Sequence, residues 1–394
     1  MSPMGLLFLT LFNSILGLSI LFPIIGPLAR ELGLTEFQTG LFSTAYALMQ
    51  FLMSPYWGRK SEEVGRKPIL LVGILGFSVS FFLFAVFAQL RFAGVLGVGA
   101  TFLLLLLARL VGGTFSSATL PTAQAYVADV TGRAERTAGM ALIGAAFGLG
   151  VIVGPGLGGL LAKLHLLAPV YFSAGLALLN ALFVLVALPE PRRHVHLETK
   201  PVLRPHDPRI LPLLLAGLVV SLASVGMETT VAFFFQDRLG LDARATARAV
   251  ATALVVYGLA AVFVQGFLIR KFKWPPRLLL GLGLPLSILG FLTFVFAQNF
   301  GFLTLALVLQ GVGQGLAAPG ITAALSLAVG EHEQGLVAGL NSSAQALGRM
   351  LGPLLGTGLY QWIAPAAPYA ASAALLVLAG LLLLSPASRK ALQA

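Results

Sequence analysis

Long apolar runs alternate with short polar loops along the whole chain. Each run has about the length that an α-helix needs to cross the hydrocarbon core of a bilayer, which is roughly 20 residues. The runs lie near residues 5–29, 37–57, 68–90, 97–128, 138–162, 167–188, 210–235, 246–268, 278–298, 302–327, 335–359 and 366–386. This pattern predicts an all-α membrane protein with twelve transmembrane helices.

The second half of the pattern repeats the first half at a fixed distance. The fifth run carries glycines and a proline that recur in the eleventh run, 198 residues later. The matched residues are Gly150, Gly154, Pro155 and Gly158 in the fifth run, and Gly348, Gly352, Pro353 and Gly356 in the eleventh. The same offset carries Gly113 to Gly311 and Pro121 to Pro319. A parallel repeat of this kind is typical of transporters that rock two helix bundles about a central site.

The longest polar gap separates the two halves. It spans residues 189–209, is rich in proline and charge, and is too short and too polar to fold alone. We therefore expect two pseudo-symmetric six-helix bundles, over residues 1–188 and 210–394, joined by a cytoplasmic linker over residues 189–209.

Composition agrees with a lipid environment and excludes several kinds of chemistry. Hydrophobic residues make up 58% of the chain and charged residues 10%, whereas a soluble domain carries roughly a quarter charged residues. There is no cysteine, and all five histidines lie in the polar gaps. We expect no metal site, no cofactor and no enzymatic activity, because the runs hold no histidine to pair with a nucleophile. There is also no P-loop, so the expected energy source is a proton gradient rather than ATP.

The net charge of +11 is interpreted as a topology signal. The basic residues are spread over short loops, and most of them fall on one side of the membrane if both termini are cytoplasmic. The expected location is the plasma membrane (the inner membrane of a bacterium), with both ends inside. The expected partners are membrane lipids and a small-molecule substrate, and no nucleic acid.

The loop after the second run carries a motif of eleven residues. Residues 58–68 read GRKSEEVGRKP and resemble the signature of the major facilitator superfamily, G-x-L-A-D-R-x-G-R-K-x-x-L. Arg109-x3-Gly113 in the fourth run resembles the second motif of that family. The glycine–proline motif of the fifth run resembles the drug:proton antiporter branch, as does the segment that contains Asp129. The resemblance implies the twelve-helix major facilitator fold and a monomer that works by alternating access.

Several motif residues are expected to gate the cytoplasmic side. In the family an acid of the signature locks the two halves together; here the aspartate is replaced by Glu62, and Glu63 stands where the family has arginine. The candidates for gating are Gly58, Glu62, Gly65, Arg66 and Asp129, together with Gly154, Pro155, Gly158, Gly352 and Pro353 of the glycine–proline motifs. The loop glycines are expected to permit a tight turn. The alternatives are a plain topology signal for the loop, a simple helix-end acid at Asp129, and ordinary helix packing for the glycines of the spans.

Three ionisable side chains lie clearly inside the runs: Arg109, Glu228 and Arg349. A charge in the bilayer core costs at least about 2.5–3.5 kcal/mol, so each is a candidate functional group. Glu228 shares a helical face with Ser221 and Ser224, and we expect it to be the proton-coupling site. The resemblance implies that Arg109 lies near the proton site and tunes it. The alternative for Glu228 and Arg109 is a purely structural role.

Polar residues at helical spacing predict a central cavity with a polar layer. The candidate substrate-binding residues are Asn341, Gln345 and Arg349 in the eleventh run, Gln310 and Gln314 in the tenth, Asn13 in the first and Gln50 in the second. For each amide alone, hydrogen bonding between helices is an equal alternative.

The leading functional hypothesis is proton-coupled efflux of small lipophilic or drug-like compounds by a secondary active transporter. A second hypothesis is transport of an anionic metabolite or amphiphilic lipid, because two buried arginines face one buried glutamate. Uptake of a sugar or nutrient is a variant of the second hypothesis. The charge of the compounds that the protein transports would distinguish the first hypothesis from the second.

Overall fold

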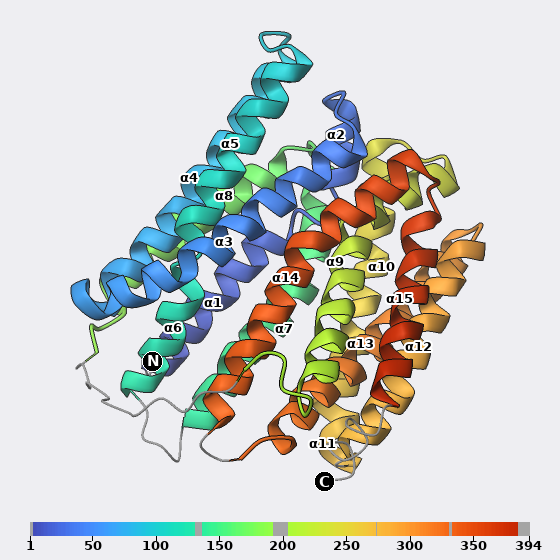
Figure 1. Ribbon diagram of the computed structural model, residues 1–394. Coiled ribbons are helices and arrows are strands. Elements are labelled where there is room, and N and C mark those ends of the chain that lie inside the picture. The colour runs from blue at the N-terminus through green and yellow to red at the C-terminus, as the bar shows by residue number, and fades with distance from the viewer. Residues whose placement is uncertain (1–2, 131–135, 192–203, 273, 331–332, 385–394) are drawn as a thin grey trace. The chain divides into compact units, whose positions relative to one another are not determined.

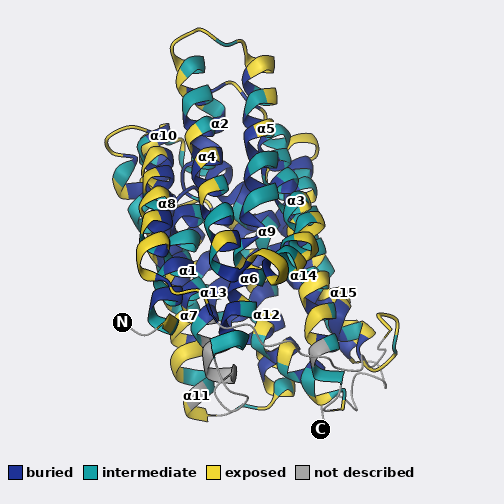
Figure 2. Ribbon diagram, turned by 90° about the vertical axis from the view of Figure 1, so that its left-hand side faces the viewer, coloured by how far each residue is buried: buried dark blue, intermediate teal, exposed yellow. Residues whose placement is uncertain are grey.

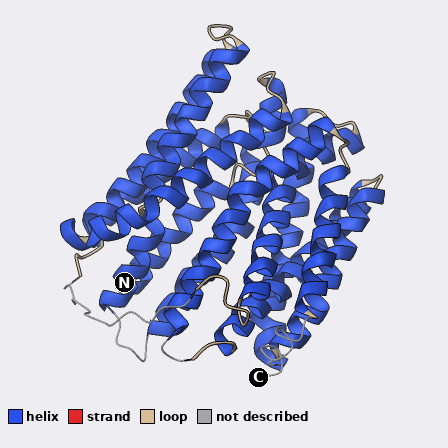
Figure 3. Ribbon diagram, viewed as in Figure 1, coloured by secondary structure: helices blue, strands red, loops and turns tan. Residues whose placement is uncertain are grey.

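The structure is a computed structural model that describes residues 3–130, 136–191, 204–272, 274–330 and 333–384. Over these residues the chain folds into helices joined by short loops, and none of them lies in a strand (Figure 3). The chain divides into two compact units. The first comprises Met1–His196 with Asp242–Thr252, and the second comprises Leu197–Leu241 with Ala253–Ala394.

The first unit holds α1 (Pro3–Ser19), α2 (Ile25–Glu31), α3 (Glu36–Val64), α4 (Arg66–Phe92), α5 (Val98–Ser116), α6 (Thr119–Val130), α7 (Arg136–Leu161), α8 (Ala168–Ala187) and the first half of α10 (Ala243–Phe263) (Figure 1). The fourth predicted run is divided between α5 and α6 for a local reason. Pro121 has no N–H to give to the carbonyl of Ser117, one turn earlier. The N–H of Ala118 instead bonds to the carbonyl of Phe115 at 3.0 Å, which ends α5 in a tight turn.

The second unit holds α9 (Leu211–Leu239), the second half of α10, a π-helical segment (Val264–Leu268), α11 (Ile269–Phe272), α12 (Pro276–Phe296), α13 (Phe300–Leu327), α14 (Gln334–Trp362) and α15 (Ala367–Leu383). Pro319, which the repeat relates to Pro121, lies inside α13 without a break. The two halves therefore share a sequence pattern but differ in backbone at this pair of prolines.

All twelve predicted runs coincide with one helix or with a pair of consecutive helical segments. Within the described residues, seven helices are long and apolar enough to cross a membrane, and three shorter apolar helices accompany them. The long helices α3 and α14 are more polar, since they carry Gln50 and the amides Asn341 and Gln345. The chain is an integral membrane protein, and the count of twelve crossings stays a prediction.

Helix packing repeats between the two units. In the first unit α1 packs on α7, α4 on α5, and α4 on α8; in the second unit α9 packs on α14, α12 on α13, and α12 on α15. These are the same pairs, six predicted spans apart. Buried and exposed positions alternate around the helices (Figure 2), and many exposed positions are apolar. Leu179 and Val186 of α8, for example, are 65% and 78% exposed, as expected for a surface that faces lipid.

The glycines of the repeated motif lie at the closest helix contacts. A β-carbon on Gly154 would lie 1.9 Å from Oγ of Ser19 in α1, and one on Gly352 would lie 2.7 Å from the carbonyl oxygen of Leu222 in α9. Gly150, Gly158, Gly348 and Gly356 make contacts of the same kind, all closer than 3.0 Å. Only glycine lets these helix pairs approach so closely. Ordinary helix packing therefore accounts for the glycines. Helices α7 and α14 continue through Pro155 and Pro353 without a break. A gating role for these residues stays a prediction.

Candidate functional site

Glu228 in α9 is half-buried and lies in a polar cluster drawn from three helices. Ser224, one turn earlier, donates its hydroxyl to Oε1 of Glu228 at 3.3 Å. Tyr257 in α10 makes a side-chain hydrogen bond with Ser224. Arg349 in α14 acts electrostatically on Glu228, although the two form no ion pair among the described residues. We call Glu228, Ser224, Tyr257 and Arg349 the Glu228 cluster.

The Glu228 cluster has the groups that proton exchange requires. A carboxyl can take up and release a proton, and the hydroxyl of Ser224 can donate to the carboxylate or accept from the protonated form. Tyr257 extends the hydrogen-bonded path from α9 to α10. The exposed guanidinium of Arg349 supplies an opposite charge from α14.

Arg109 in α5 is buried among aromatic rings. Its guanidinium carbon lies 5.0 Å from the ring centroid of Phe81, 5.1 Å from that of Phe84 and 5.7 Å from that of Tyr46. Its Nε has no hydrogen-bond partner in the described part of the chain, and no acid there pairs with it. The faces of the aromatic rings therefore stabilise the positive charge of the guanidinium by cation–π interaction. Arg109 belongs to the first unit and Glu228 to the second, and the expectation that the arginine tunes the proton site stays a prediction.

Tyr46 and Tyr257 occupy equivalent places in the two units. A β-carbon on Gly113 would lie 2.5 Å from the carbonyl oxygen of Tyr46, and one on Gly311 would lie 2.4 Å from that of Tyr257. Gly113 and Gly311 are the pair that the repeat relates. The sequence analysis missed both tyrosines, because 211 positions separate them whereas 198 separate the glycines. A repeat search that allowed loops of different length would have paired them.

The amides of α13 and α14 have different surroundings. Gln310 is fully buried, and its Nε2 donates to the carbonyl oxygen of Ser287 in α12 at 2.7 Å. This contact supports the interhelical alternative for Gln310 rather than contact with substrate. Asn341 is also buried, and its Oδ1 would lie 3.2 Å from a β-carbon on Gly217 of α9. Both amides are therefore positioned between packed helices.

The remaining candidates for substrate contact are more open. Asn13, Gln50, Gln314 and Gln345 are half-buried, and Arg349 is exposed. The backbone oxygen of Gln345 accepts a hydrogen bond from Ser221 at 2.9 Å, which fixes α14 against α9. Ser221 thus lies at the α9–α14 contact, whereas Ser224 and Glu228 interact with each other.

The signature loop is a single-residue turn between two long helices. Gly65 joins α3 to α4 with φ of 125°, a conformation that only glycine adopts readily. The prediction of a tight turn is correct at Gly65 and wrong at Gly58, which lies inside α3. Helix α3 runs further than the sequence pattern predicted, so Gly58 has no turn to make.

Arg66 and Asp129 form a buried ion pair at this turn. Nε of Arg66 lies 2.8 Å from Oδ2 of Asp129, and the two side chains are 9% and 7% exposed. Nη1 of Arg66 also donates to Oγ of Ser61 at 2.7 Å. The pair ties the start of α4 to the end of α6, so Asp129 is more than a simple helix-end acid.

Glu62, the residue in place of the family's aspartate, is exposed and has no hydrogen bond or ion pair within the described residues. The neighbouring Glu63 pairs with Lys60 at 2.8 Å. The hydrogen bond between them raises the pKa of Lys60 and lowers the pKa of Glu63. In the first unit Asp129, and not Glu62, is the partner of the signature arginine.

Glu190 is a further residue that the sequence analysis missed. Its carboxylate accepts the backbone N–H of Arg66 at 2.6 Å and that of Lys67 at 2.9 Å. These are the first two N–H groups of α4, which have no partner inside the helix. Glu190 lies three residues beyond the end of α8, inside the segment that the sequence predicts as the linker. A carboxylate just beyond a predicted helix end was the available signal.

A second group of charges lies outside the spans in the second unit. Arg209 contacts Oδ2 of Asp207 at 2.8 Å and Oε1 of Glu333 at 3.2 Å. Its hydrogen bonds hold the pKa of both carboxyls below their usual values and raise the pKa of Arg209. This cluster fixes the segment before α9 to the residue before α14.

The described residues contain no group of three or more histidine, cysteine, aspartate or glutamate side chains placed to hold a metal ion. Seven long apolar helices and packing that repeats between the two units define an integral membrane protein with an internal repeat. The chain belongs to the Major Facilitator Superfamily, whose family model matches residues 7–285 and again residues 249–393. It is therefore a transporter and not an enzyme.

Known proteins of similar sequence agree with this assignment. The chain is 30% identical over 360 residues to multidrug resistance protein 1 of Bacillus subtilis (strain 168), covering 90% of this chain and 89% of the relative. It is 27% identical over 366 residues to quinolone resistance protein NorA of Staphylococcus aureus (strain MSSA476), with the same coverage.

Solved structures show the same fold. A bacterial homolog of the human lysosomal transporter Spinster, in an inward-facing and occupied conformation, is similar with a TM-score of 0.75 at 17% identity, covering 98% of this chain and 96% of that one. The human organic anion transporter MFSD10 is similar with a TM-score of 0.69 at 23% identity, covering 96% of this chain and 98% of that one.

Proposed function

We propose that the protein exports small lipophilic, drug-like compounds in exchange for protons, and that Glu228 carries the coupling proton. The observation that carries this proposal is the Glu228 cluster, in which a half-buried carboxyl contacts a hydroxyl at 3.3 Å within a membrane-spanning helix. A charge at such a position is energetically costly, which makes the carboxyl a candidate for function. The names of the relatives, which refer to multidrug and quinolone resistance, support drug-like substrates.

The proposed cycle uses Glu228 as the site where proton and substrate alternate. Glu228 takes a proton from the outside as substrate leaves, the two bundles rock, and the proton is released inside. Ser224 and Tyr257 keep the carboxyl hydrogen-bonded in both protonation states, because a hydroxyl can donate or accept. In this cycle Arg109 tunes the exchange from the first bundle.

The proposal assigns substrate contact to the more open polar residues. Asn13, Gln50, Gln314, Gln345 and Arg349 are half-buried or exposed, which supports this role for them. Gln310 and Asn341 are buried against neighbouring helices, and the proposal assigns them to helix packing rather than to substrate contact.

The proposed gate lies on the side of the signature turn. The Arg66–Asp129 pair fixes the turn, and exposed Glu62 is free to contact the other bundle in one state of the cycle. The glycine contacts around Gly154 and Gly352 act as the pivots. Both termini and the linker over residues 189–209 lie in the cytoplasm, and the protein works as a monomer in the plasma membrane, the inner membrane in a bacterium.

The test is a proton-flux assay in liposomes with an imposed pH gradient. A panel of cationic, neutral and anionic compounds is added to wild type, to Glu228→Gln and to a control variant, Glu31→Gln, which removes an exposed carboxyl at the end of α2. We expect lipophilic compounds to stimulate proton movement in wild type and in Glu31→Gln, and at least a tenfold smaller response in Glu228→Gln.

The outcomes separate the alternatives. Normal proton-driven transport by Glu228→Gln would remove Glu228 from the coupling step. Movement of compound by wild type without proton flux would overturn proton coupling itself, and selective movement of anions would favour transport of an anionic metabolite or lipid.

A further inference from the structure

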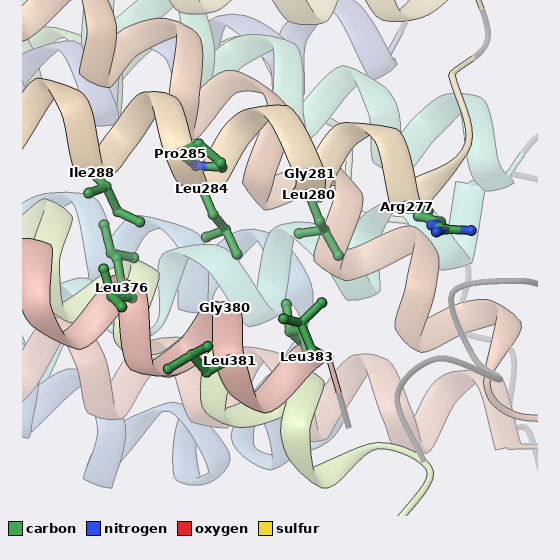
Figure 4. Close-up of a pocket in the computed structure, with 12 residues that line it drawn as sticks. Arg277, Leu280, Gly281, Leu284, Pro285, Ile288, Leu376, Gly380, Leu381 and Leu383 are labelled. Carbon is green, nitrogen blue, oxygen red and sulfur yellow. The ribbon is translucent and has the colours of Figure 1, made fainter. Parts of the chain in front are cut away.

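An apolar groove runs between α12 and α15 in the second unit. Its cavity volume is about 580 Å³, and leucines from both helices line it. In Figure 4, Leu280, Leu284 and Leu376 point into the space between the helices, Arg277 stands at one end and Ile288 at the other. The Glu228 cluster contributes no residue to this groove.

Two glycines keep the groove open. A β-carbon on Gly281 of α12 or on Gly380 of α15 would meet no atom within 4 Å, so each glycine borders empty space. On the face of α12 that packs against α13 the space is closed, because a β-carbon on Gly283 would lie 2.7 Å from the backbone nitrogen of Ala317. The open space therefore lies on the α15 side of α12.

The surroundings of the groove are those of a lipid-facing surface. Leu289 of α12 and Leu378 and Leu381 of α15 are 51%, 57% and 58% exposed. An integral membrane protein tolerates such a row of exposed leucines only where it faces hydrocarbon. A groove in such a surface would be filled by an acyl chain rather than by water.

One end of the groove carries a positive charge. Arg277 lies in the first turn of α12, is exposed, and has no hydrogen-bond or ion-pair partner among the residues that the structure describes. The preceding segment is typical of a membrane interface, where aromatic and basic side chains mix. Lys271 lies 5.2 Å from the ring centroid of Phe267, and Phe272 stacks on Trp274 with centroids 5.6 Å apart.

The length of the groove matches one leaflet. From Arg277 to Ile288 the helix advances eleven residues, which is about 16 Å at 1.5 Å per residue. Half of a bilayer core of about 30 Å is about 15 Å. A phosphate at Arg277 would thus place its acyl chain along the whole groove.

We propose that this groove binds a phospholipid with a net negative headgroup, with its phosphate at Arg277 and one acyl chain between α12 and α15 beside Gly281 and Gly380. The site takes a structural lipid of the leaflet on the side of the α11–α12 loop, and it is separate from the site of transport. A neutral lipid fits the same groove but gains less from the arginine, because a net negative headgroup interacts more strongly with a basic side chain at the interface.

The proposal is tested with the full-length protein in detergent by native mass spectrometry. Phosphatidylglycerol and phosphatidylcholine with identical acyl chains are titrated separately onto wild type and variants. Arg277→Gln removes the charge, and Gly281→Leu and Gly380→Leu fill the groove from either helix. The matched controls are Arg248→Gln, an exposed arginine of α10, and Gly175→Leu, an exposed glycine of α8 that also borders open space.

We expect wild type to bind phosphatidylglycerol more tightly than phosphatidylcholine. Arg277→Gln should lower the affinity for phosphatidylglycerol about fivefold, the usual effect of one basic residue at a membrane surface. The two leucine variants should weaken binding of both lipids, and both control variants should bind as wild type does.

Three results would overturn the proposal. The first is equal affinity of wild type for the two lipids, and the second is unchanged lipid binding by both Gly281→Leu and Gly380→Leu. The third is loss of transport of a dye in both leucine variants with unchanged lipid binding, which would assign the groove to substrate instead.

Discussion

Ser19 in α1 donates its hydroxyl to the backbone oxygen of Gly150 in α7 at 2.7 Å, directly beside the closest contact between these helices. The same hydroxyl lies 1.9 Å from where a β-carbon on Gly154 would stand. One small polar side chain thus makes both the hydrogen bond and the tight contact. Any side chain at position 154 must displace it.

Gly154→Ala should therefore destabilise the protein, whereas Gly148→Ala should not. Overpacking of a close contact costs about 1–3 kcal/mol, and loss of the Ser19 hydrogen bond adds to this cost. A β-carbon on Gly148, in the same helix, would meet no atom within 4 Å. Thermal unfolding in detergent measures both variants. Equal midpoints for the two would mean that α7 does not pack on α1 as described.

Breaking the Arg66–Asp129 pair should be costly. Removing one partner of a buried pair leaves the other charge unpaired, which costs about 3–5 kcal/mol. We expect Asp129→Asn to lower the unfolding midpoint strongly, and Glu62→Gln to leave it unchanged because Glu62 is exposed. A double variant, Arg66→Gln with Asp129→Asn, should lose less than the sum of the single variants. Additive losses would show that the two residues are not coupled.

Tyr257→Phe should slow proton-coupled transport while keeping the fold. It removes one hydroxyl from the Glu228 cluster, and a single hydrogen bond is worth about 0.5–1.5 kcal/mol, or a twofold to tenfold change in rate. The pH at which transport is half-maximal should shift with the rate, which a purely structural effect would not cause. Tyr171→Phe, at an exposed position of α8, is the control. An unchanged pH profile in Tyr257→Phe would remove the tyrosine from the cluster's function.

The Arg209 cluster should make stability depend on pH in the acid range. Its contacts lower the pKa of Asp207 and Glu333, so the folded state binds their protons less readily than the unfolded chain does. Their stabilising contribution is complete above the unfolded values near 4 and is lost as pH falls through the lower folded values.

Arg209→Gln should therefore reduce the unfolding midpoint at pH 7 and have almost no effect near pH 2. The effect should be small, because these groups are exposed to solvent. Arg204→Gln, an exposed arginine of the same polar segment, should change neither midpoint. If the unfolding midpoint of Arg209→Gln were also lower than that of wild type near pH 2, the cause would be lost packing instead of lost charge.

Helix positions could be predicted from sequence because a bilayer imposes a minimum apolar length on every crossing. The close glycine contacts could be predicted as well, since two matched motifs at one offset require matched packing. The break before α6 could not, because Pro121 and Pro319 look alike in sequence while only one of them ends a helix. Backbone carbonyls freed by proline find different partners in different surroundings.

The candidate site was harder to predict from sequence, because the spacing of residues along a helix does not determine which of its faces points inward. Gln310 and Gln314 share a helical face by spacing, yet Gln310 is fully buried against Ser287 while Gln314 is half-buried. Glu228 and Arg349 were found because charges inside a span are rare. Tyr257 was not, since a tyrosine in an apolar run resembles ordinary packing.

The capping of α4 by Glu190 makes one carboxylate serve two helices. Glu190 accepts the N–H groups of Arg66 and Lys67 and stands three residues beyond the end of α8. It therefore joins the end of α8 to the start of α4 within the first unit. Because both hydrogen bonds end on one side chain, a single substitution at position 190 would remove this joint and leave the first two N–H groups of α4 without their partner.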